Sequence, residues 1–525
     1  MRIESLIAVF ALSVFSFSFF SFKLFAIFQQ CSYRISEFLP VVFKRKNSEI
    51  VRLSTYSLVF CIVLTAFSII LKETIQVSVY ATMSICLSGI YYFKSKIIKQ
   101  AKFTKRYIRI YFVACLICGF YSLAVVNFTW RLAKNTQYLA CVFLGLLPTL
   151  TPLFISLSTL INLPYDKVRY EISKQRCRKR LRHNKKLIKI GITGSFGKTS
   201  VKEILYKMLS VKYNVLATPM SYNTPLGICK TVKKDVGSFD VFIAEMGARY
   251  KNDIKELCRL VEPSVGIITG IAEQHTATLG NIQDVKMAKN QLIEGLLPNG
   301  FAVFSTQTPL SLEMYEEATC KKFLVGEDPN CFVRLINAQQ TESGIEFEFE
   351  VERKRYKTFA PLLGEHNAIN VCLAIAVCVN LGIEVEKLLA VIPTLTPIKH
   401  RAQIITTPRG VKVIDDGYNA NLKGILSTAK SIEVFSGYKI AVTSGIVELG
   451  KNSQKINTEV GKILAKSFDL VIGVGANARH IQRGVISNDV EFLAVKRTED
   501  AKEIIKNRTK AGDLVAFFND IPDRY

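Results

Sequence analysis

Five long apolar stretches in the first 165 residues constrain the fold more than any other feature of the chain. They are Leu6 to Phe28, Tyr56 to Leu71, Gln76 to Phe93, Tyr107 to Trp130 and Tyr138 to Leu163. A bilayer offers no water to backbone amides and carbonyls, so a chain crosses it as helices or as a closed barrel, and one helix needs about 20 apolar residues. The pattern predicts an α-helical, multi-pass membrane domain of about five helices over residues 1–165.

The charges between these stretches predict the orientation of the domain. Lys and Arg gather after the first, third and fifth stretches, whereas the other loops are nearly free of charge. The positive-inside rule then places the N-terminus outside the cell and everything after about residue 165 in the cytoplasm. A cleaved signal peptide is the alternative for the first stretch, but that stretch is long, lacks a small-residue cleavage site and is followed by further spans.

A basic run follows the last apolar stretch directly. Between Lys167 and Lys189 there are eleven Lys and Arg residues and one acid, Glu171, in a chain whose net charge is +26. This placement is typical of a juxtamembrane linker, here residues 166–186, that contacts an anionic membrane surface. Only Tyr170 adds an aromatic side chain and no nucleic-acid module surrounds the run, so we expect no nucleic acid as a partner.

The 13 cysteines lack metal-type spacing, which suits a reducing compartment.

From Leu187 the chain changes to short β-rich runs separated by helical patterns and glycine-rich turns, which is typical of a parallel α/β sheet. Between a strand ending at Ile192 and a helix starting at Val201, the turn reads T-G-S-F-G-K-T-S. Amides of such a turn surround phosphate oxygens, its lysine supplies a cation and its threonine a hydroxyl for Mg²⁺. The turn predicts a phosphate loop that binds ATP through Gly194, Ser195, Gly197, Lys198, Thr199 and Ser200. Ile192 stands where the common motif has its first glycine.

Two later strands also end in polar residues. Val241 to Ala244 is followed by Glu245, and Val265 to Thr269 leads to His275. Because the carboxyl ends of parallel strands share one edge, Glu245 is predicted to hold a metal beside the phosphate loop. A solvated strand end is the alternative for Glu245, and a surface loop residue is the alternative for His275. Farther along, Val333 to Val351 predicts a β-hairpin.

Seven segments follow one another in a defined order. They are T-G-S-F-G-K-T-S, Y-N-T-P-L-G (222–227), E-M-G-A (245–248), the segment around His275, A-K-N-Q-L-I (288–293), G-E-H-N-A-I-N (364–370) and D-D-G-Y-N-A-N (415–421). In this order the chain resembles the Mur ligases from about residue 187 to 515, and within them the MurF-like branch, which adds D-Ala-D-Ala to a UDP-muramoyl tripeptide. The resemblance implies a P-loop central domain over 187–395 and a C-terminal Rossmann-like domain over 396–525.

The resemblance also implies a reaction and a set of site residues. In this family an acceptor carboxylate attacks the γ-phosphate of ATP, and an amine then displaces phosphate from the acyl phosphate. The implied catalytic residues are Lys198, His275, Lys289 and Arg401. The implied Mg²⁺ ligands are Thr199, Thr224, Glu245, His275 and Lys289, the last after N-carboxylation. The implied nucleotide contacts beyond the phosphate loop are His366, Asn367, Asn370, Arg401, Asp416, Tyr418 and Asn419.

Some of these residues have plainer interpretations. A lysine on a helix is by default solvated, and Lys286 competes with Lys289 for the family position. Asn367 and Asn370 are equally suited to capping and turn roles at a helix start. The residue types alone therefore leave these assignments open.

The chain departs from the family at three places. Membrane spans replace the UDP-binding domain, Gly445 stands where the family has an aspartate, and the glycine-rich C-terminal tail is lacking. We therefore expect retained ATP chemistry with altered substrates. The acceptor is a UDP-linked muramoyl peptide or a lipid-linked envelope glycopeptide, and the amine donor is an amino acid or a dipeptide such as D-Ala-D-Ala.

Two other classes of protein combine membrane spans with a phosphate loop. A non-catalytic, nucleotide-binding membrane scaffold would be indicated by loss of Lys198, Glu245 or His275, and all three are present. A transport ATPase is disfavoured because the only LSGGQ-like match, Leu87 to Gly89, lies within an apolar stretch, and because the 415–421 segment has no role in such a protein.

Overall fold

The computed structural model describes residues 3–31, 33–44, 58–59, 62–63, 101–132, 139–233, 236–272, 279–397, 402–417, 422–446, 449, 452–486 and 490–518. The chain divides into two compact units, one up to Arg169 and one from Tyr170 onward. The second and third apolar stretches of the sequence lie almost entirely outside the described residues.

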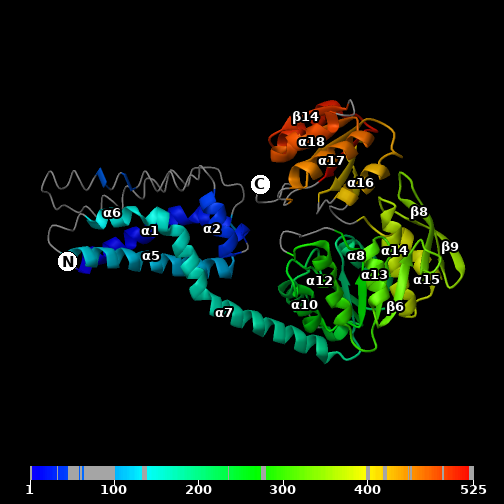
Figure 1. Ribbon diagram of the computed structural model, residues 1–525, viewed down its shortest axis with the longest axis horizontal. Helices are drawn as coiled ribbons and strands as arrows, with labels where there is room; N and C mark the ends of the chain where they lie inside the picture. The colour runs from blue at the N-terminus through cyan, green and yellow to red at the C-terminus, as the bar shows by residue number, and fades with distance from the viewer. Residues whose placement is uncertain are drawn as a thin grey trace. The chain divides into compact units, whose positions relative to one another are not determined.

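The first unit is helical (Figure 1). The helices among its described residues are α1 (Ile3–Gln30), α2 (Ile35–Lys44), α5 (Lys105–Leu132), α6 (Leu139–Gly145) and the first part of α7 (Leu147–His183). Among the described residues, two helical segments, Lys105–Thr129 and Leu147–His183, are long and apolar enough to cross a membrane. A third is added if the two parts of α1, which meet at 48°, count as one span.

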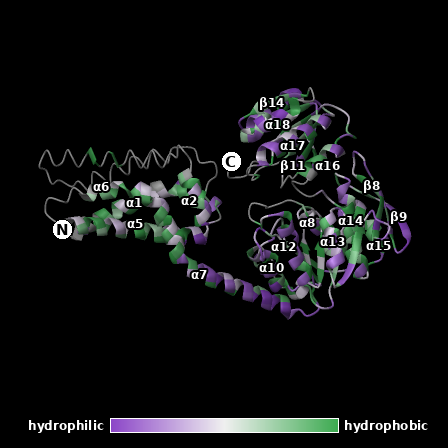
Figure 2. Ribbon diagram, viewed as in Figure 1, coloured by the Kyte–Doolittle hydropathy of each residue, from purple (hydrophilic) through white to green (hydrophobic). Residues whose placement is uncertain are grey.

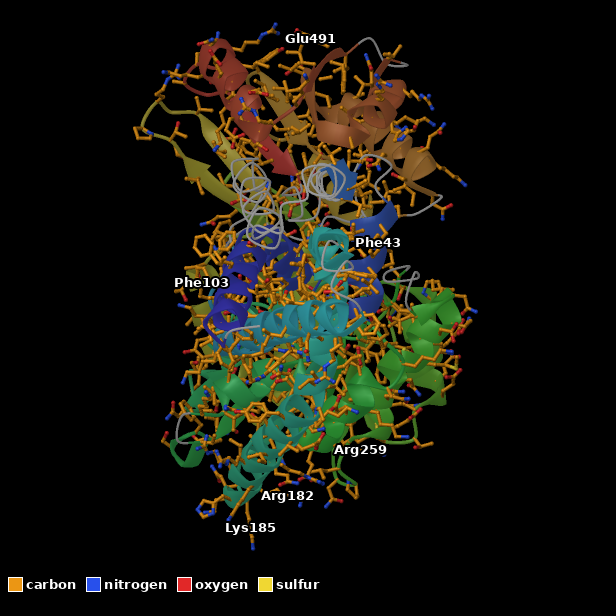
Figure 3. All side chains as sticks on the ribbon, turned by 90° about the vertical axis from the view of Figure 1, so that its left-hand side faces the viewer. Phe43, Phe103, Arg182, Lys185, Arg259 and Glu491 are labelled. Atoms are coloured by element: carbon orange, nitrogen blue, oxygen red, sulfur yellow. The ribbon has the colours of Figure 1, made fainter. Side chains whose placement is uncertain are left out.

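Apolar side chains form both the inside and the outside of this unit. Phe25 packs against Phe28 and Tyr107 in its core. Phe43 and Phe103, labelled in Figure 3, are 50% and 66% exposed. Figure 2 shows hydrophobic residues around α1, α5 and α6. A helix that is apolar on all sides suits a buried or lipid-facing environment rather than water.

Helix α7 changes character along its length, from hydrophobic near its start to hydrophilic toward its end (Figure 2). The basic run that we expected to be a linker is therefore largely helical. Its last turns belong to the second unit, where Cys177 and Leu181 are buried in a hydrophobic cluster with Ile228 and Leu257. These contacts make the end of α7 part of the folded second unit.

Two carboxylates on or next to α10 (Asp253–Val261) receive the basic side chains of α7. Glu256 accepts a hydrogen bond from Lys174 at 2.7 Å. Glu262 accepts one from Arg178 at 2.9 Å and pairs with Arg182, which lies near the end of α7 in Figure 3. Part of the basic run that we assigned to a membrane surface thus pairs with carboxylates of the protein.

The middle part of the chain forms a nine-stranded sheet with the order β2-β3-β1-β4-β5-β6-β7-β8-β9. The strands are β1 (Ile188–Thr193), β2 (Val215–Ala217), β3 (Val241–Glu245), β4 (Val265–Ile268), β5 (Phe301–Ser305), β6 (Lys321–Gly326), β7 (Val333–Gln340), β8 (Ile345–Val351) and β9 (Lys354–Ala360). Neighbouring strands are parallel from β2 to β7, and β7, β8 and β9 are antiparallel. The expected hairpin is β7 and β8.

Side chains of the parallel strands alternate between two hydrophobic clusters. Ile190 and Ile243 belong to the cluster that contains α8 (Lys198–Leu209) and α14 (His366–Asn380). Phe242 belongs to the cluster of the other face, with residues of α10 and α12 (Ile282–Glu294). Because helices cover both faces, the central strands are almost continuously apolar. The other α-helices among the described residues of this part are α9 (Pro225–Thr231), α13 (Pro309–Glu317) and α15 (Val385–Val391).

The last part of the chain forms a six-stranded sheet with the order β10-β11-β15-β12-β13-β14. Its strands are β10 (Gln403–Thr406), β11 (Lys412–Asp416), β12 (Lys439–Thr443), β13 (Leu470–Val474), β14 (Glu491–Val495) and β15 (Leu514–Phe518). Its helices are α16 (Leu422–Ser431), α17 (Ser453–Ser467), α18 (Ala478–Val485) and α19 (Thr498–Arg508). Only β10 runs antiparallel to its neighbour among these described strands.

The contact of α7 with Glu262 predicts a pH-dependent contribution to stability. Hydrogen bonds from Arg182 and Arg178 outweigh partial burial and lower the pKa of Glu262 to about 2. A lowered carboxyl pKa adds stability above about pH 4.5, and this stability is lost as the pH falls toward 2. We expect Glu262→Gln to lower the melting temperature at pH 7 by about 2–4 °C, equivalent to about 1 kcal/mol, and the difference to shrink below pH 4.5.

The control is Glu171→Gln on the outer side of α7. Glu171 pairs with Lys174 within the same helix and its side chain is 55% exposed. We expect this variant to melt within about 1 °C of the parent chain at pH 7, because exposed ion pairs contribute little. Equal losses for both variants, measured by differential scanning fluorimetry, would contradict a specific role of Glu262.

Candidate functional site

The turn between β1 and α8 is shaped for a close approach of backbone to ligand. Gly197 caps α8 in the left-handed region with φ +75°, which glycine adopts without strain. A Cβ on Gly194 would overlap the hydroxyl of Thr269 at the end of β4. Ser195 donates its amide to Gly270 O at 2.7 Å, which joins the turn to the next strand edge. The turn is therefore held in place, with its amides at the start of a helix, as a phosphate-binding loop requires.

Two lysines converge on one carbonyl oxygen of this turn. Lys198 Nζ and Lys289 Nζ lie 2.7 Å and 2.9 Å from Gly194 O. Lys289 is only 3% exposed. Burial lowers the pKa of Lys289 well below its usual value, and the nearby cation of Lys198 acts in the same direction. Burial and the neighbouring cation therefore both disfavour the charged form of Lys289.

The two candidate lysines of α12 have different surroundings. Lys286 Nζ lies 3.0 Å from Glu313 and 2.7 Å from Glu317, both on α13. Lys289, three residues later, is directed to Gly194 of the phosphate loop. Of the two, only Lys289 therefore contacts the predicted site.

Glu245, the last residue of β3, is the buried carboxylate of the site. It is 1% exposed. Its Oε2 accepts a hydrogen bond from Thr199 Oγ1 at 3.0 Å, and its Oε1 accepts one from Asn223 Nδ2 at 3.3 Å. Its amide donates to Thr218 Oγ1 at 3.1 Å. The parallel register of β1 and β3 brings this strand end beside the phosphate loop.

Another neighbour of Glu245, Lys202, was missed by the sequence analysis. Lys202 is completely buried, and its Nζ lies 3.5 Å from Glu245 Oε2. It also donates a hydrogen bond to the carbonyl of Met220. Lys202 follows Thr199 by three residues, so both side chains lie on one face of α8. That spacing was the available signal.

Thr224 lies in the loop that follows β2. Its side chain caps α9 by accepting a hydrogen bond from the amide of Gly227 at 3.3 Å. The preceding residue, Asn223, contacts Glu245. The loop thus comes to the same strand edge, while the hydroxyl of Thr224 acts as a helix cap.

The oxygen atoms around Glu245 fit Mg²⁺ better than a softer metal. The Thr199 hydroxyl and the Glu245 carboxylate are hard ligands, and Mg²⁺ commonly binds through one or two carboxylates together with substrate phosphates. Within the described residues, no group of three or more His, Cys, Asp or Glu side chains is placed to hold a metal. The set therefore suits an ion whose shell is completed by a nucleotide.

The start of α14 adjoins the phosphate loop. The side-chain oxygen of Asn370 lies 3.0 Å from the place that a Cβ of Gly197 would take. Asn370 donates to Asn367 Oδ1 at 2.8 Å, and Asn367 donates to the carbonyl of Leu363 at 2.8 Å. His366 Nδ1 lies 2.6 Å from Ser427 Oγ. The structure brings Asn370 to the loop, and it gives Asn367 a local bond of the kind that stabilises a helix start.

The remaining predicted residues divide into two groups. Asp416 ends β11, where its carboxylate accepts a hydrogen bond from Thr428 Oγ1 at 2.9 Å. The second group lies outside the described residues and consists of His275, Arg401, Tyr418 and Asn419. Their roles stay predictions.

The surroundings of Gly445, where the resemblance led us to expect an aspartate, account for a residue without a side chain. Gly445 follows β12 with φ +73°, and a Cβ there would overlap the side-chain oxygen of Asn457. Asn457 is completely buried and accepts a hydrogen bond from the amide of Ile446 at 2.7 Å, while it donates to the carbonyl of Ser453 at 3.0 Å. Asn457 thus occupies the space that a side chain at position 445 would need.

Comparisons with known proteins extend over both α/β parts. The model of the Mur ligase middle domain matches residues 192–378, and the model of the Mur ligase glutamate ligase domain matches residues 400–518. The UDP-N-acetylmuramoyl-tripeptide–D-alanyl-D-alanine ligase of Bacillus subtilis (strain 168) is 29% identical over 334 residues, which are 62% of this chain and 72% of that enzyme. The enzyme of the same name from Escherichia coli (strain K12) is 26% identical over 295 residues, 56% of this chain and 65% of that enzyme.

The fold is also similar to that of solved structures. The structure of MurF from Thermotoga maritima in complex with ADP superposes with a TM-score of 0.60 and 23% identity, over 67% of this chain and 80% of that one. At this identity the likeness concerns the fold. The chain spans about two thirds of the length of the Escherichia coli relative.

The surroundings of Gly445 predict that an aspartate is not tolerated at this position. We expect Gly445→Asp to lower the melting temperature by more than about 4 °C, because the new side chain overlaps buried Asn457 and overpacking of this kind costs about 1–3 kcal/mol. Gly475→Asp is the matched control, since Gly475 also has φ +73° but no described atom lies within 4 Å of its Cβ site. A loss no larger than that of the control would show that Asn457 does not exclude the side chain.

Proposed function

Because the chain belongs to the Mur ligase family, whose members are ATP-dependent ligases, we propose that it forms an amide bond in peptidoglycan precursor synthesis. The overall reaction joins a carboxylate to an amine and converts ATP to ADP and phosphate. The observation that carries the proposal is the convergence of Lys198, Lys289 and the Thr199–Glu245 pair at the carboxyl ends of β1 and β3. Cationic, hydroxyl and carboxylate groups meet there, as phosphoryl transfer requires.

The residues of this site have separate tasks in the proposed reaction. The amides of Ser195 to Thr199 and the cation of Lys198 bind and orient the phosphates of ATP. The acceptor carboxylate then attacks the γ-phosphorus and ADP leaves. The amine attacks the resulting acyl phosphate, and phosphate leaves as the amine loses a proton. His275, Arg401, Asp416, Tyr418 and Asn419 are proposed to complete the nucleotide and acyl-phosphate contacts.

Thr199 and Glu245 are the residues proposed to hold Mg²⁺, with Thr224 and His275 nearby. When bound, the ion neutralises charge that develops on the transferred phosphoryl group. Lys289 is proposed to carry an N-carboxyl group. Two lysine side chains contact the same carbonyl oxygen, so their positive charges would lie close together, which is unfavourable. Carboxylation of Lys289 would place a negative charge beside Lys198 instead.

The proposed acceptor is a muramoyl peptide, and the proposed amine is D-Ala-D-Ala or another amino acid or dipeptide. The named relatives are ligases of D-alanyl-D-alanine and a UDP-linked muramoyl tripeptide. A lipid-linked envelope glycopeptide is the second candidate acceptor. It is favoured by the apolar helical unit that precedes the family match, since lipid-linked substrates reside in a membrane.

The domain plan of the proposed enzyme combines a membrane anchor with cytoplasmic ligase domains. Residues 1–165 form the multi-pass anchor, 166–186 the basic juxtamembrane segment, 187–395 the ATP-binding domain and 396–525 the C-terminal domain. The two apolar helices and the exposed side chains of Phe43 and Phe103 support the anchor. The exposed basic side chains that remain on α7, including Lys167 and Lys179, are proposed to face anionic lipid.

The proposed activity predicts ATP- and Mg²⁺-dependent ligation by the full chain. Purified protein is incubated with ATP, Mg²⁺, D-Ala-D-Ala and either the UDP-linked or the lipid-linked muramoyl tripeptide, and phosphate release and product mass are measured. We expect product with one acceptor, and a loss of about 100-fold or more in Lys289→Met, because the site loses a group that faces the phosphate loop.

Lys286→Met is the matched control on the same helix. It removes two ion pairs with half-exposed glutamates, so we expect unchanged turnover and a stability loss below about 1 kcal/mol. Absence of phosphate release with both acceptors would overturn the proposed activity. Equal losses in the two variants would overturn the assignment of Lys289.

The proposed anchor predicts a defined topology. In spheroplasts of an expression host, an epitope tag at the N-terminus is expected to be digested by external protease. A tag at the C-terminus is expected to be digested only after the membrane is permeabilised. Protection of both tags, or recovery of the chain in the soluble fraction, would contradict the proposed topology without bearing on the ligase reaction.

A further inference from the structure

Lys202 is a charged residue of the site for which the proposed reaction has no role. Its side chain is completely buried in α8. A buried ammonium group is unfavourable unless a carboxylate or other acceptors compensate it. Its neighbours therefore indicate what it does.

Three oxygen atoms surround the Lys202 ammonium group. Glu245 Oε2 lies at 3.5 Å and Glu203 Oε1 at 3.2 Å, and the carbonyl of Met220 accepts a hydrogen bond. The Glu203 side chain is 40% exposed, whereas that of Glu245 is 2% exposed. Since solvent screens the pair with Glu203, the dominant ionic partner is Glu245.

Lys202 and Thr199 act on the same oxygen of Glu245. Both lie on one face of α8, and both approach Oε2, at 3.5 Å and 3.0 Å. Asn223 occupies the other oxygen at 3.3 Å. The orientation of the carboxylate is thus determined by three side chains from two elements.

Lys202 also connects this carboxylate to the loop after β2. Met220 has φ +47°, a left-handed conformation that is unusual for a residue with a side chain. A hydrogen bond from a buried ammonium group to its carbonyl stabilises that conformation. The same loop carries Asn223 and Thr224 to the site. Removing Lys202 therefore affects both the carboxylate and the loop beside it.

We propose that Lys202 is a positioning residue that holds Glu245 and the Met220 loop in the geometry that accepts Mg²⁺ together with a nucleotide. This proposal rests on the proposed function of the site. A cation 3.5 Å from the carboxylate opposes a free divalent ion by repulsion. Nucleotide phosphates bring the negative charge that offsets this repulsion. Metal binding thus depends on the nucleotide, while nucleotide contacts with Lys198 do not depend on Lys202.

Binding of fluorescent mant-ADP to the full chain, with and without Mg²⁺, tests the proposal independently of turnover. In Lys202→Met we expect metal-free affinity to stay within about twofold and the Mg²⁺-dependent gain in affinity to fall by about 10- to 100-fold, the usual effect of losing a group that orients a metal ligand. Lys202→Arg keeps a cation and is expected to recover part of the gain. Lys207→Met, an exposed lysine of the same helix, is the control and is expected to behave as the parent chain.

A double-mutant cycle separates positioning from a general effect on folding. Glu245→Gln removes the carboxylate, so adding Lys202→Met to it is expected to cause no further loss of the Mg²⁺-dependent gain. Lys202→Met alone leaves the buried Glu245 carboxylate without its cation, whereas the double variant removes both charges. The double variant can therefore be measured if Lys202→Met does not fold. Its melting temperature is measured in parallel.

The outcomes distinguish the two proposals. If Lys202→Met keeps the Mg²⁺-dependent gain, or if it lowers this gain equally with and without Glu245, the positioning role is overturned. If the parent chain binds no mant-ADP at all, the proposed nucleotide site fails instead. A loss of metal-free affinity as large as the loss of the gain would show a role toward the nucleotide itself and would also contradict the proposal.

Discussion

The buried carboxylate of Glu245 is the constraint on which the rest of the site depends. A carboxylate at the end of a central strand, 1% exposed, requires partners from every element around it. Thr199 comes from the helix of the phosphate loop, Asn223 from the loop after β2 and Lys202 from the second turn of α8. The elements that would bind nucleotide are therefore joined around one negative charge.

The sheet makes this meeting possible. Because β1, β3 and β4 are parallel neighbours, their carboxyl ends lie at one edge of the sheet. Their apolar side chains alternate between the two faces, and each face packs against a layer of helices. Polar side chains are then left only at the ends of the strands. The parallel register of these strands therefore separates an apolar interior from the polar edge that carries the site.

Local patterns in the sequence predicted the parts of the site that depend on neighbours in the chain. The strand, turn and helix around Gly194 and Lys198 belong to this class, as does the hairpin of β7 and β8. Long-range pairing was not predictable in this way. The choice between Lys286 and Lys289 depended on α13, and the partners of the basic run, Glu256 and Glu262, lie about 80 residues farther along. Lys202 was overlooked because a helical lysine is solvated by default. Its spacing from Thr199 places both residues on one face of α8, but the spacing does not indicate that the buried end of β3 faces them.

The last turns of α7 have a consequence for isolating the ligase part of the chain. A fragment started at Leu187, where the β-rich pattern begins, would lose Cys177 and Leu181 and would open the hydrophobic cluster that they share with residues of α9 and α10. It would also leave Glu262 without its two arginines. Such a fragment would be prone to aggregate, since exposed apolar patches promote association. A fragment that starts at Tyr170 instead keeps the contacts of the end of α7 with the second unit. It also begins where the two compact units of the chain divide.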